Sequence, residues 1–275
     1  MTVTNSPNSV RGHQPRSWCC MPEKRDRATE EYRRHWEANG TQIAEALGDR
    51  LKLIEATFDT YAAVERYFHW VAVRDDGITA IRTPLKSAMT LCYKSSLAIF
   101  SAYELTRHGF HGSAAPLLRQ SYEALMIGKY CALVETELLH EQWLRGDPVL
   151  IGRDILRHIR SPDPEPLRVL WRELCQITHL SIYAQQYDLS FSHNETAVAA
   201  SLVIIMMLLE CTYHLLGSYV ISPTTQYYAV RYGKATDLIQ LRRELKSCFA
   251  KSREHLSSDA VRAVNCYKRR WTLIS

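Results

Sequence analysis

One long apolar stretch constrains the fold more than any other feature of this sequence. It extends from Ala197 to Leu209 and contains a single polar residue, Ser201. Glu210 and His214 follow it, so it falls short of the roughly twenty apolar residues that a membrane-spanning helix needs. A helix that is apolar on all sides and does not cross a bilayer belongs in a protein core. We therefore expect a buried central helix, no membrane span, and other helices packed around it.

The composition favours helices for the rest of the chain as well. The 275 residues include only 11 Gly and 10 Pro, too few for the many turns of a β-sandwich, barrel or propeller. Apolar residues recur at helical intervals through most of the sequence. The fold class that follows is all-α, an up-down multi-helix bundle of about five to seven principal helices. Helices are predicted near 28–38, 41–73, 84–108, 113–143, 149–159, 167–178 and 195–219, and from Thr236 onward.

Breaks between these helices are predicted where helix-terminating residues occur. Asn39-Gly40 is expected to separate the first two helices, with Thr41 as the cap of the second. Alternating prolines between Ser161 and Pro166 predict an extended loop, because proline lacks a backbone donor and restricts the residue before it. Three segments are left open: 180–193 is ambiguous, and 219–221 and 227–230 are candidates for short strands.

In the helix that begins near Pro84, apolar residues recur every three to five positions and predict the face that packs on the core. They are Leu85, Met89, Cys92, Leu97, Phe100 and Tyr103. The helix expected after it starts with Ser113 as its cap and Pro116 in its first turn.

The sequence divides into three parts by composition. Residues 1–27 are polar and proline-containing, and predict a flexible N-terminal tail. Residues 28–230 are expected to form the helical bundle domain, and residues 231–275 a basic amphipathic C-terminal helical segment packed on it or extending it. The N-terminus lacks the pattern of a secretory signal, and most of the eight cysteines fall at helical positions. We therefore expect a cytoplasmic protein with reduced thiols.

Positive charge is concentrated at the two ends of the chain. The last 45 residues, 231–275, carry eleven Lys/Arg against four Asp/Glu, whereas residues 37–230 are mildly acidic. Such a segment is typical of a surface that binds a polyanion such as RNA, although a solvated helical face has the same composition. The candidate polyanion-binding residues are Arg242, Arg243, Lys246, Lys268, Arg269 and Arg270.

A second pattern lies between Ala102 and Tyr130, where one helix ends at a glycine and the next begins with small residues. It consists of Gly109, Ala114, Ala115, Leu118, Arg119 and Glu123. This pattern resembles a group of uncharacterised bacterial all-helical proteins, in which a later helix ends near a histidine, here His179. Arg119 and Glu123 are four residues apart, so they are expected to pair on one helix face. The pair either ties two helices together or orients a functional group.

Arg172 and His179 form the candidate catalytic pair. Seven residues separate them, so both side chains share one helical face if the helix continues that far. The spacing resembles the Arg-x4–6-His motif of HEPN-type helical nucleotide-binding and ribonuclease domains of toxin and phage-defence systems. That resemblance implies metal-independent RNA cleavage, in which Arg172 steadies the phosphate and His179 acts in acid–base catalysis. Glu173 departs from the motif, because the family has Asn, Asp or His after the arginine.

The sequence contains an incomplete metal-binding motif and no nucleotide-binding motif. A di-iron bundle needs two Glu-x-x-His helices and two further glutamates, and Glu137 and His140 form the single clear copy. Phosphate-loop, dinucleotide-binding and Gly-x-Ser-x-Gly fingerprints are absent from the sequence. We therefore expect no metal and no cofactor.

Two functional hypotheses follow from these patterns. The first is a cytosolic helical-bundle protein that acts through association, as a homo-oligomer. The alternative is a metal-independent endoribonuclease that uses Arg172 and His179. RNA is the expected partner if the basic C-terminal segment binds a polyanion.

Overall fold

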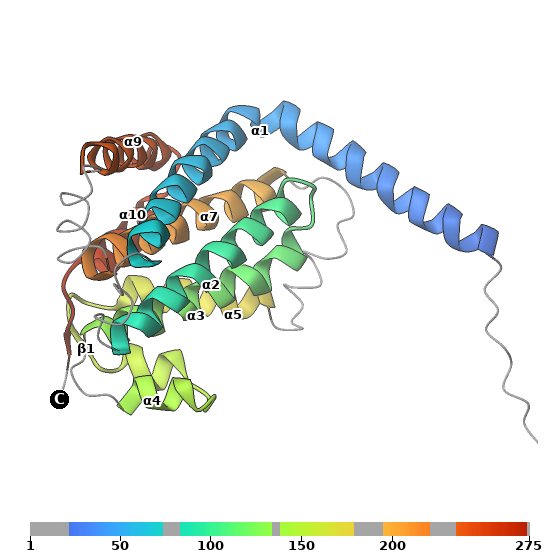
Figure 1. Cartoon of the computed structure of the whole chain (residues 1–275). Coiled ribbons are helices and arrows are strands. Elements are labelled where there is room, and N and C mark those ends of the chain that lie inside the picture. Colours follow the sequence, from blue (N-terminus) through green and yellow to red (C-terminus); the bar gives the residue numbers. More distant parts are fainter. Residues whose placement is uncertain (1–21, 74–82, 134–137, 179–194, 221–234, 274–275) are drawn as a thin grey trace, which may run out of the picture.

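The computed structural model describes residues 22–73, 83–133, 138–178, 195–220 and 235–273, and these form an all-α bundle with one very short sheet (Figure 1). The fold class predicted from the sequence is therefore confirmed. The labels of Figure 1 are used throughout, with η for the two short π-helical segments. The elements are α1 (Pro22–Val73), α2 (Thr83–Thr106), α3 (His111–Leu133), α4 (Leu138–Leu144), η1 (Ile151–Leu156), β1 (Ile159–Ser161), α5 (Glu165–Thr178), α7 (Glu195–Leu215), η2 (Leu216–Val220), α9 (Ala235–Arg253), α10 (Ser258–Lys268) and β2 (Thr272–Leu273).

Helix α7 is the central helix that the apolar stretch predicts. It packs against α2, α3 and α10, and its side chains Ile205 and Leu209 are fully buried. The segment Glu195–Ser218 is long and apolar enough to cross a membrane by length and composition, and 72% of its most apolar window is buried inside the bundle. The apolar surface of this helix is thus covered largely by its own neighbours.

Helix α1 corrects the predicted break at Asn39-Gly40. The helix begins at Pro22, inside the predicted tail, and continues through both residues, with a kink at Leu47, where the backbone angles are φ −125° and ψ 16°. Glycine at position 40 serves a close approach, since a Cβ there would lie 2.9 Å from His108 Nδ1 of the α2–α3 turn. The N-terminal end of α1 projects beyond the other helices (Figure 1).

The single helix expected over residues 113–143 is also wrong. Helix α3 ends at Leu133, and the residues up to Trp143 belong partly to the separate helix α4. Helix α4 is held against α2 by a buried hydrogen bond of 2.8 Å between Ser87 Oγ and His140 Nδ1. This contact joins residues far apart in the sequence, which a periodicity argument does not detect.

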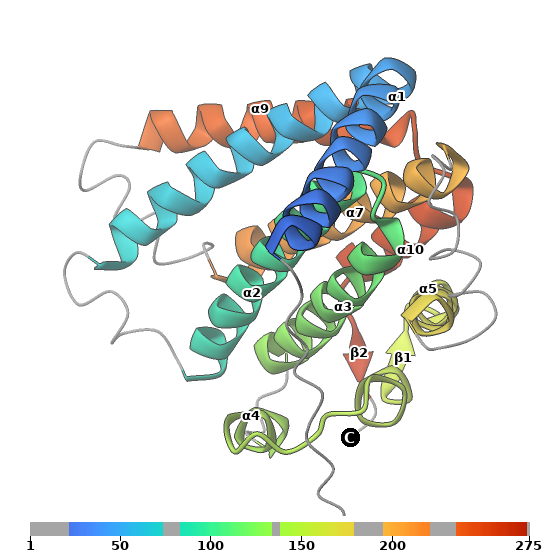
Figure 2. The ribbon, with the colours of Figure 1, turned by 90° about the vertical axis from the view of Figure 1, so that its right-hand side faces the viewer.

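Two further segments differ from the prediction. The expected helix over 149–159 is reduced to η1, followed by strand β1, which pairs antiparallel with β2 (Figure 2). The Asp154 carboxylate accepts a hydrogen bond of 2.7 Å from the Leu150 N–H and holds the start of η1. Of the candidate strand residues, Tyr219 and Val220 lie in η2, whereas residue 221 and the segment 227–230 lie outside the described residues.

The predicted core-facing side of α2 is correct at Cys92 and Tyr103, which are buried, and wrong at two other positions. Leu97 and Phe100 are 49% and 50% exposed. The buried side carries Ser95, whose hydroxyl lies 2.7 Å from Ser121 Oγ and 2.9 Å from Thr212 Oγ1. Small hydroxyl residues let α2, α3 and α7 approach closely, and their hydrogen bonds satisfy the buried oxygens. An apolar stripe alone therefore identified the wrong face of this helix at two positions.

The C-terminal part of the chain completes the bundle around α7. Helix α9 lies alongside the second half of α1, and α10 packs against α7 and α5 (Figure 2). Leu238, Leu245, Phe249 and Ser252 are the buried positions of α9. Ile239 is exposed, but most of the remaining surface is polar and basic, and part of the helix faces α7.

Candidate functional site

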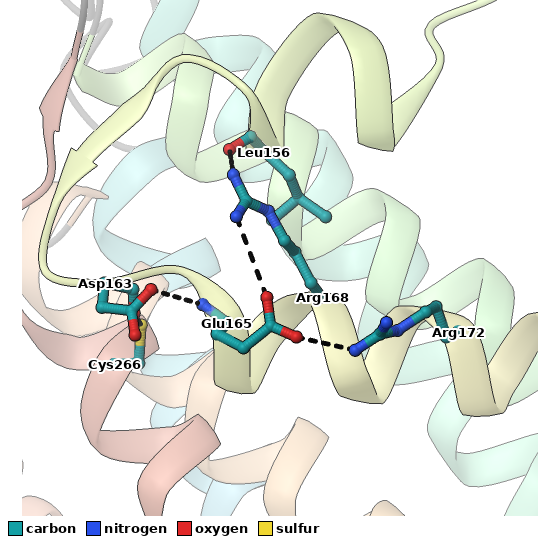
Figure 3. A network of polar contacts seen from close by, with 6 residues as sticks. All are labelled: Leu156, Asp163, Glu165, Arg168, Arg172 and Cys266. Carbon is teal, nitrogen blue, oxygen red and sulfur yellow. Dashed lines mark hydrogen bonds and ion pairs between the residues drawn. The ribbon is translucent and has the colours of Figure 1, made fainter.

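The predicted catalytic arginine lies on an exposed face of α5. Its guanidinium Nη2 donates to Glu165 Oε1 at 2.7 Å, and Arg168 Nη1 lies 3.8 Å from the other carboxylate oxygen (Figure 3). The Arg172 side chain is 63% exposed. His179 lies outside the described residues, so the spatial relation between Arg172 and His179 is not part of the structure. Within the part of the chain that the structure describes, the Arg172 guanidinium contacts Glu165, a carboxylate of its own helix.

Arg119 and Glu123 form the pair that their spacing predicts. Arg119 Nε lies 3.0 Å from Glu123 Oε1 on α3. The same guanidinium donates to Thr178 Oγ1 at 3.2 Å and lies over the ring of Trp171, 5.0 Å from its centroid. Thr178 and Trp171 both belong to α5, so Arg119 connects α3 to α5.

A basic cleft opens where α7, η2, α9 and α10 meet, with a volume of about 540 Å³. Three of the six candidate polyanion-binding residues, Arg242, Lys246 and Lys268, line this cleft together. The other residues that line it are Glu210, Tyr213, His214, Gly217, Ser218, Phe249, Ala250 and Arg253. Arg243, Arg269 and Arg270 are exposed and do not line it.

The geometry of α9 explains why its cations converge on the cleft. Positions 242, 246, 249 and 253 are three or four residues apart, so they form one stripe along the helix. Phe249 is buried against Tyr213 of α7, with 5.6 Å between ring centroids. This aromatic contact fixes the stripe beside α7, and Arg242, Lys246 and Arg253 consequently face the cleft.

A buried carboxylate lies at the base of the cleft. Glu210 Oε1 is 2.5 Å from Arg253 Nη2 and 3.0 Å from Lys268 Nζ, and Arg253 Nε donates to Oε2 at 3.3 Å. The Glu210 side chain is 6% exposed, whereas Arg253 and Lys268 are each 36% exposed. Since one carboxylate neutralises one of these two cations, the buried cluster retains one positive charge.

Two further cations stand beside this cluster. Arg242 donates through Nε to the Tyr213 hydroxyl at 3.3 Å, which leaves its two terminal nitrogens directed elsewhere. Neither Arg242 nor Lys246 forms an ion pair with any residue in the described part of the chain. The four cations and the single carboxylate give the cleft a formal charge of +3.

His214 is a half-buried histidine of the cleft. Its Nδ1 lies 3.1 Å from Ser218 Oγ. Burial, together with the nearby Lys129 and Lys268 ammonium groups, lowers the pKa of His214 to about 4. The imidazole is therefore neutral at pH 7 and adds a hydrogen-bonding group to the cleft without adding charge.

Sequence reasoning missed Glu210, Arg253 and His214 as members of a site. One signal was present, because Glu210 is a carboxylate directly after thirteen nearly continuous apolar positions, where a charge is costly unless it is paired. Its partners lie 43 and 58 residues further along the chain. No local spacing rule connects such distant positions.

The described residues contain no group of three or more His, Cys, Asp or Glu side chains placed to hold a metal ion. Among known proteins, no family model matches the chain, and neither a curated protein nor a solved structure matches it. The geometry of the cleft is therefore the basis on which a function can be inferred.

Proposed function

We propose that this protein binds a phosphate-bearing ligand in the basic cleft. The observation that carries the proposal is the charge imbalance around Glu210, which takes up two cations, Arg253 and Lys268, while two more stand beside them. Confining several like charges in a concave site costs free energy through mutual repulsion. An anionic ligand relieves that repulsion, so this arrangement favours anion binding.

The types of side chain and the size of the site support a phosphate group in particular. Arginine offers paired N–H donors that match phosphate oxygens, and lysine contributes a point charge. The terminal nitrogens of Arg242 and the ammonium of Lys246 are the groups left for such contacts. A volume of about 540 Å³ lies within the range of roughly 300 to 1,000 Å³ that is usual for small-ligand sites.

RNA and free nucleotides share this phosphate chemistry, and one experiment separates them. Isothermal titration of the full chain with inorganic pyrophosphate, a 5′-mononucleotide and a single-stranded oligoribonucleotide compares the three sources. We expect binding that weakens steeply with salt. Tightest binding of the oligoribonucleotide supports the RNA expectation, and equal binding of pyrophosphate identifies a small phosphorylated ligand.

Two matched pairs of variants locate the binding to the cleft. Arg242→Ala and Lys246→Ala remove cleft cations, while Arg243→Ala and Lys251→Ala remove cations of α9 that do not line the cleft. We expect each cleft variant to weaken binding about tenfold and to reduce the salt dependence by about one phosphate contact. Equal effects of both variant sets, or no binding by the wild type, would overturn the proposal.

The endoribonuclease hypothesis remains a prediction, because His179 lies outside the described residues. It is tested with the same oligoribonucleotide, incubated in EDTA with wild type, Arg172→Ala and His179→Ala. Cleavage that leaves 2′,3′-cyclic phosphate ends and is lost in both variants would support it. RNA that is bound and remains intact would leave binding as the activity.

Homo-oligomerisation and cytoplasmic localisation also remain predictions. Light scattering coupled to size-exclusion chromatography measures the mass of the particle directly. A mass of one chain at all concentrations would remove the association hypothesis and leave the cleft proposal unaffected, since the cleft is formed within a single chain.

A further inference from the structure

Lys129 is a lysine in the protein core. It lies in the second half of α3, and its side chain is fully buried. Burial lowers the pKa of Lys129 to about 7, even though nearby cysteine side chains raise it. A lysine in this position is costly to desolvate, so it is retained only if its contacts compensate.

The contacts of Lys129 converge on the end of α10. Its Nζ donates to the backbone carbonyl of Tyr267 and, at 2.9 Å, to that of Arg269. These two carbonyls flank Lys268 on both sides. One amino group thus holds the backbone before and after the residue that faces the cleft.

Aromatic rings complete the environment of the amino group. Its Nζ lies 4.6 Å from the centroid of the Tyr267 ring and 4.3 Å from that of Trp271. Carbonyls at the C-terminus of a helix carry partial negative charge, which a cation stabilises. Lys129 therefore fixes the last turn of α10 from the core side.

The side chain of Lys268 leaves this fixed turn toward the cleft. Its ammonium lies 3.0 Å from Glu210 Oε1, the same oxygen that Arg253 contacts. Residue 268 occupies the last position of α10, where a helix frays easily unless other contacts hold it. The placement of the Lys268 charge thus depends on how firmly the last turn is held.

We propose that Lys129 is a positioning residue of the anion site, which acts by holding the backbone on either side of Lys268 so that its ammonium faces the cleft. This inference rests on the proposed function of the cleft. It assigns no ligand contact to Lys129, whose amino group is directed at carbonyls and rings.

A double-mutant cycle tests the inference, with inorganic pyrophosphate as the probe. The four proteins are wild type, Lys129→Met, Lys268→Gln and the double variant, and affinity is measured by titration with unfolding followed in parallel. Lys268→Gln should weaken binding about tenfold, because it removes one of the four positive charges that line the cleft. Lys129→Met should weaken it by a similar factor, and the double variant should bind no more weakly than Lys268→Gln alone.

A purely structural or long-range electrostatic role gives a different result. In either case the loss from Lys129→Met persists in the Lys268→Gln background, and the two effects multiply. That outcome would overturn the inference while leaving anion binding by the wild type intact. Absence of pyrophosphate binding by the wild type would instead overturn the proposed function itself.

Lys129→Gln provides the second route if Lys129→Met does not fold. The amide retains a donor for one of the two carbonyls, so the fold has a better chance of surviving while the positioning is weakened. We expect an intermediate loss of affinity that again vanishes in the Lys268→Gln background. If neither variant folds, Lys129 is required by the whole domain, and the specific role proposed for it is wrong.

Discussion

Two glutamates in this molecule each take up two cations, yet their surroundings differ sharply. Glu165 on α5 contacts Arg172 at 2.7 Å and Arg168 at 3.8 Å, and its side chain is 47% exposed. Glu210 on α7 contacts Arg253 at 2.5 Å and Lys268 at 3.0 Å, and its side chain is 6% exposed. The ratio of charges is the same at both sites, and burial is what separates them.

Burial decides what such a cluster contributes. Around Glu165, water screens the charges, and exposed pairs of this kind contribute about 0 to 1 kcal/mol. The Glu210 carboxylate is buried, so its cationic partners must compensate a large desolvation cost. A buried carboxylate with two cations is therefore strongly dependent on them, whereas the exposed one is a surface contact.

The neighbouring charges also differ. Asp163 accepts a hydrogen bond from the Glu165 N–H at 3.1 Å, and Glu173 lies on the same helix, so the α5 cluster stands among carboxylates. The Glu210 cluster instead stands beside Arg242 and Lys246. The α5 face is thus close to balanced, while the cleft has an excess of positive charge.

The largest expected effect comes from removing the buried carboxylate charge. Glu210→Gln should lower the free energy of unfolding by about 2 kcal/mol, because Arg253 and Lys268, each 36% exposed, lose their shared counter-charge and their charge-assisted hydrogen bonds. The matched variant Glu165→Gln should change it by less than about 0.5 kcal/mol. Urea denaturation of both variants measures the difference, and equal effects would abolish the distinction between the two clusters.

The second prediction concerns the pH dependence of stability that His214, a residue of the cleft, should cause. The pKa of His214 is lowered from 6.5 to about 4 in the folded protein, so between these values the unfolded chain binds more protons. Stability from this group is fully present above pH 6.5 and is lost as the pH falls toward 4, by roughly 2 kcal/mol after allowance for solvent screening. Denaturation at pH 7, 6 and 5 should show a shallower loss for His214→Gln than for wild type. Identical slopes would mean that folding does not lower the pKa of His214.

An intermediate case is the Arg119–Glu123 pair, whose side chains are partly exposed. Arg119→Ala should destabilise by about 1 kcal/mol, because it removes the hydrogen bond to Thr178 and the contact with Trp171 as well as the ion pair. Glu123→Ala should cost less than about 0.5 kcal/mol. Thermal unfolding of the two single variants and the double variant checks the order. A larger effect of Glu123→Ala would show that the pair does more than tie α3 to α5.

Rules based on short-range sequence patterns correctly predicted the features that depend on neighbouring residues. The apolar run identified α7, and the four-residue spacing identified the Arg119–Glu123 pair. The same rules failed where a contact between distant segments decides the outcome. The sequence alone suggests that Gly40 breaks the helix, whereas in the structure this glycine allows His108 to approach closely. Leu97 is exposed because α2 packs on the core through the hydroxyl contacts of its opposite side.

The candidate site illustrates the same limit. Lys246 and Lys268 were recognisable as basic residues, but nothing in their spacing indicated that α9 and α10 converge on one carboxylate of α7. Glu210, Arg253 and Lys268 come from three helices and meet only in the folded chain. Arg172 shows the converse, because its spacing suggested catalysis and the structure pairs it with Glu165.

We propose that the cleft, and not the α5 face, is the anion-binding site of this protein. The most direct test is a crystal structure of the full chain with inorganic pyrophosphate, which locates the bound anion by difference density. We expect the anion in the cleft, within hydrogen-bonding distance of Arg242 and Lys246. Density for the anion at Arg172, or none in the cleft at a saturating concentration, would contradict it.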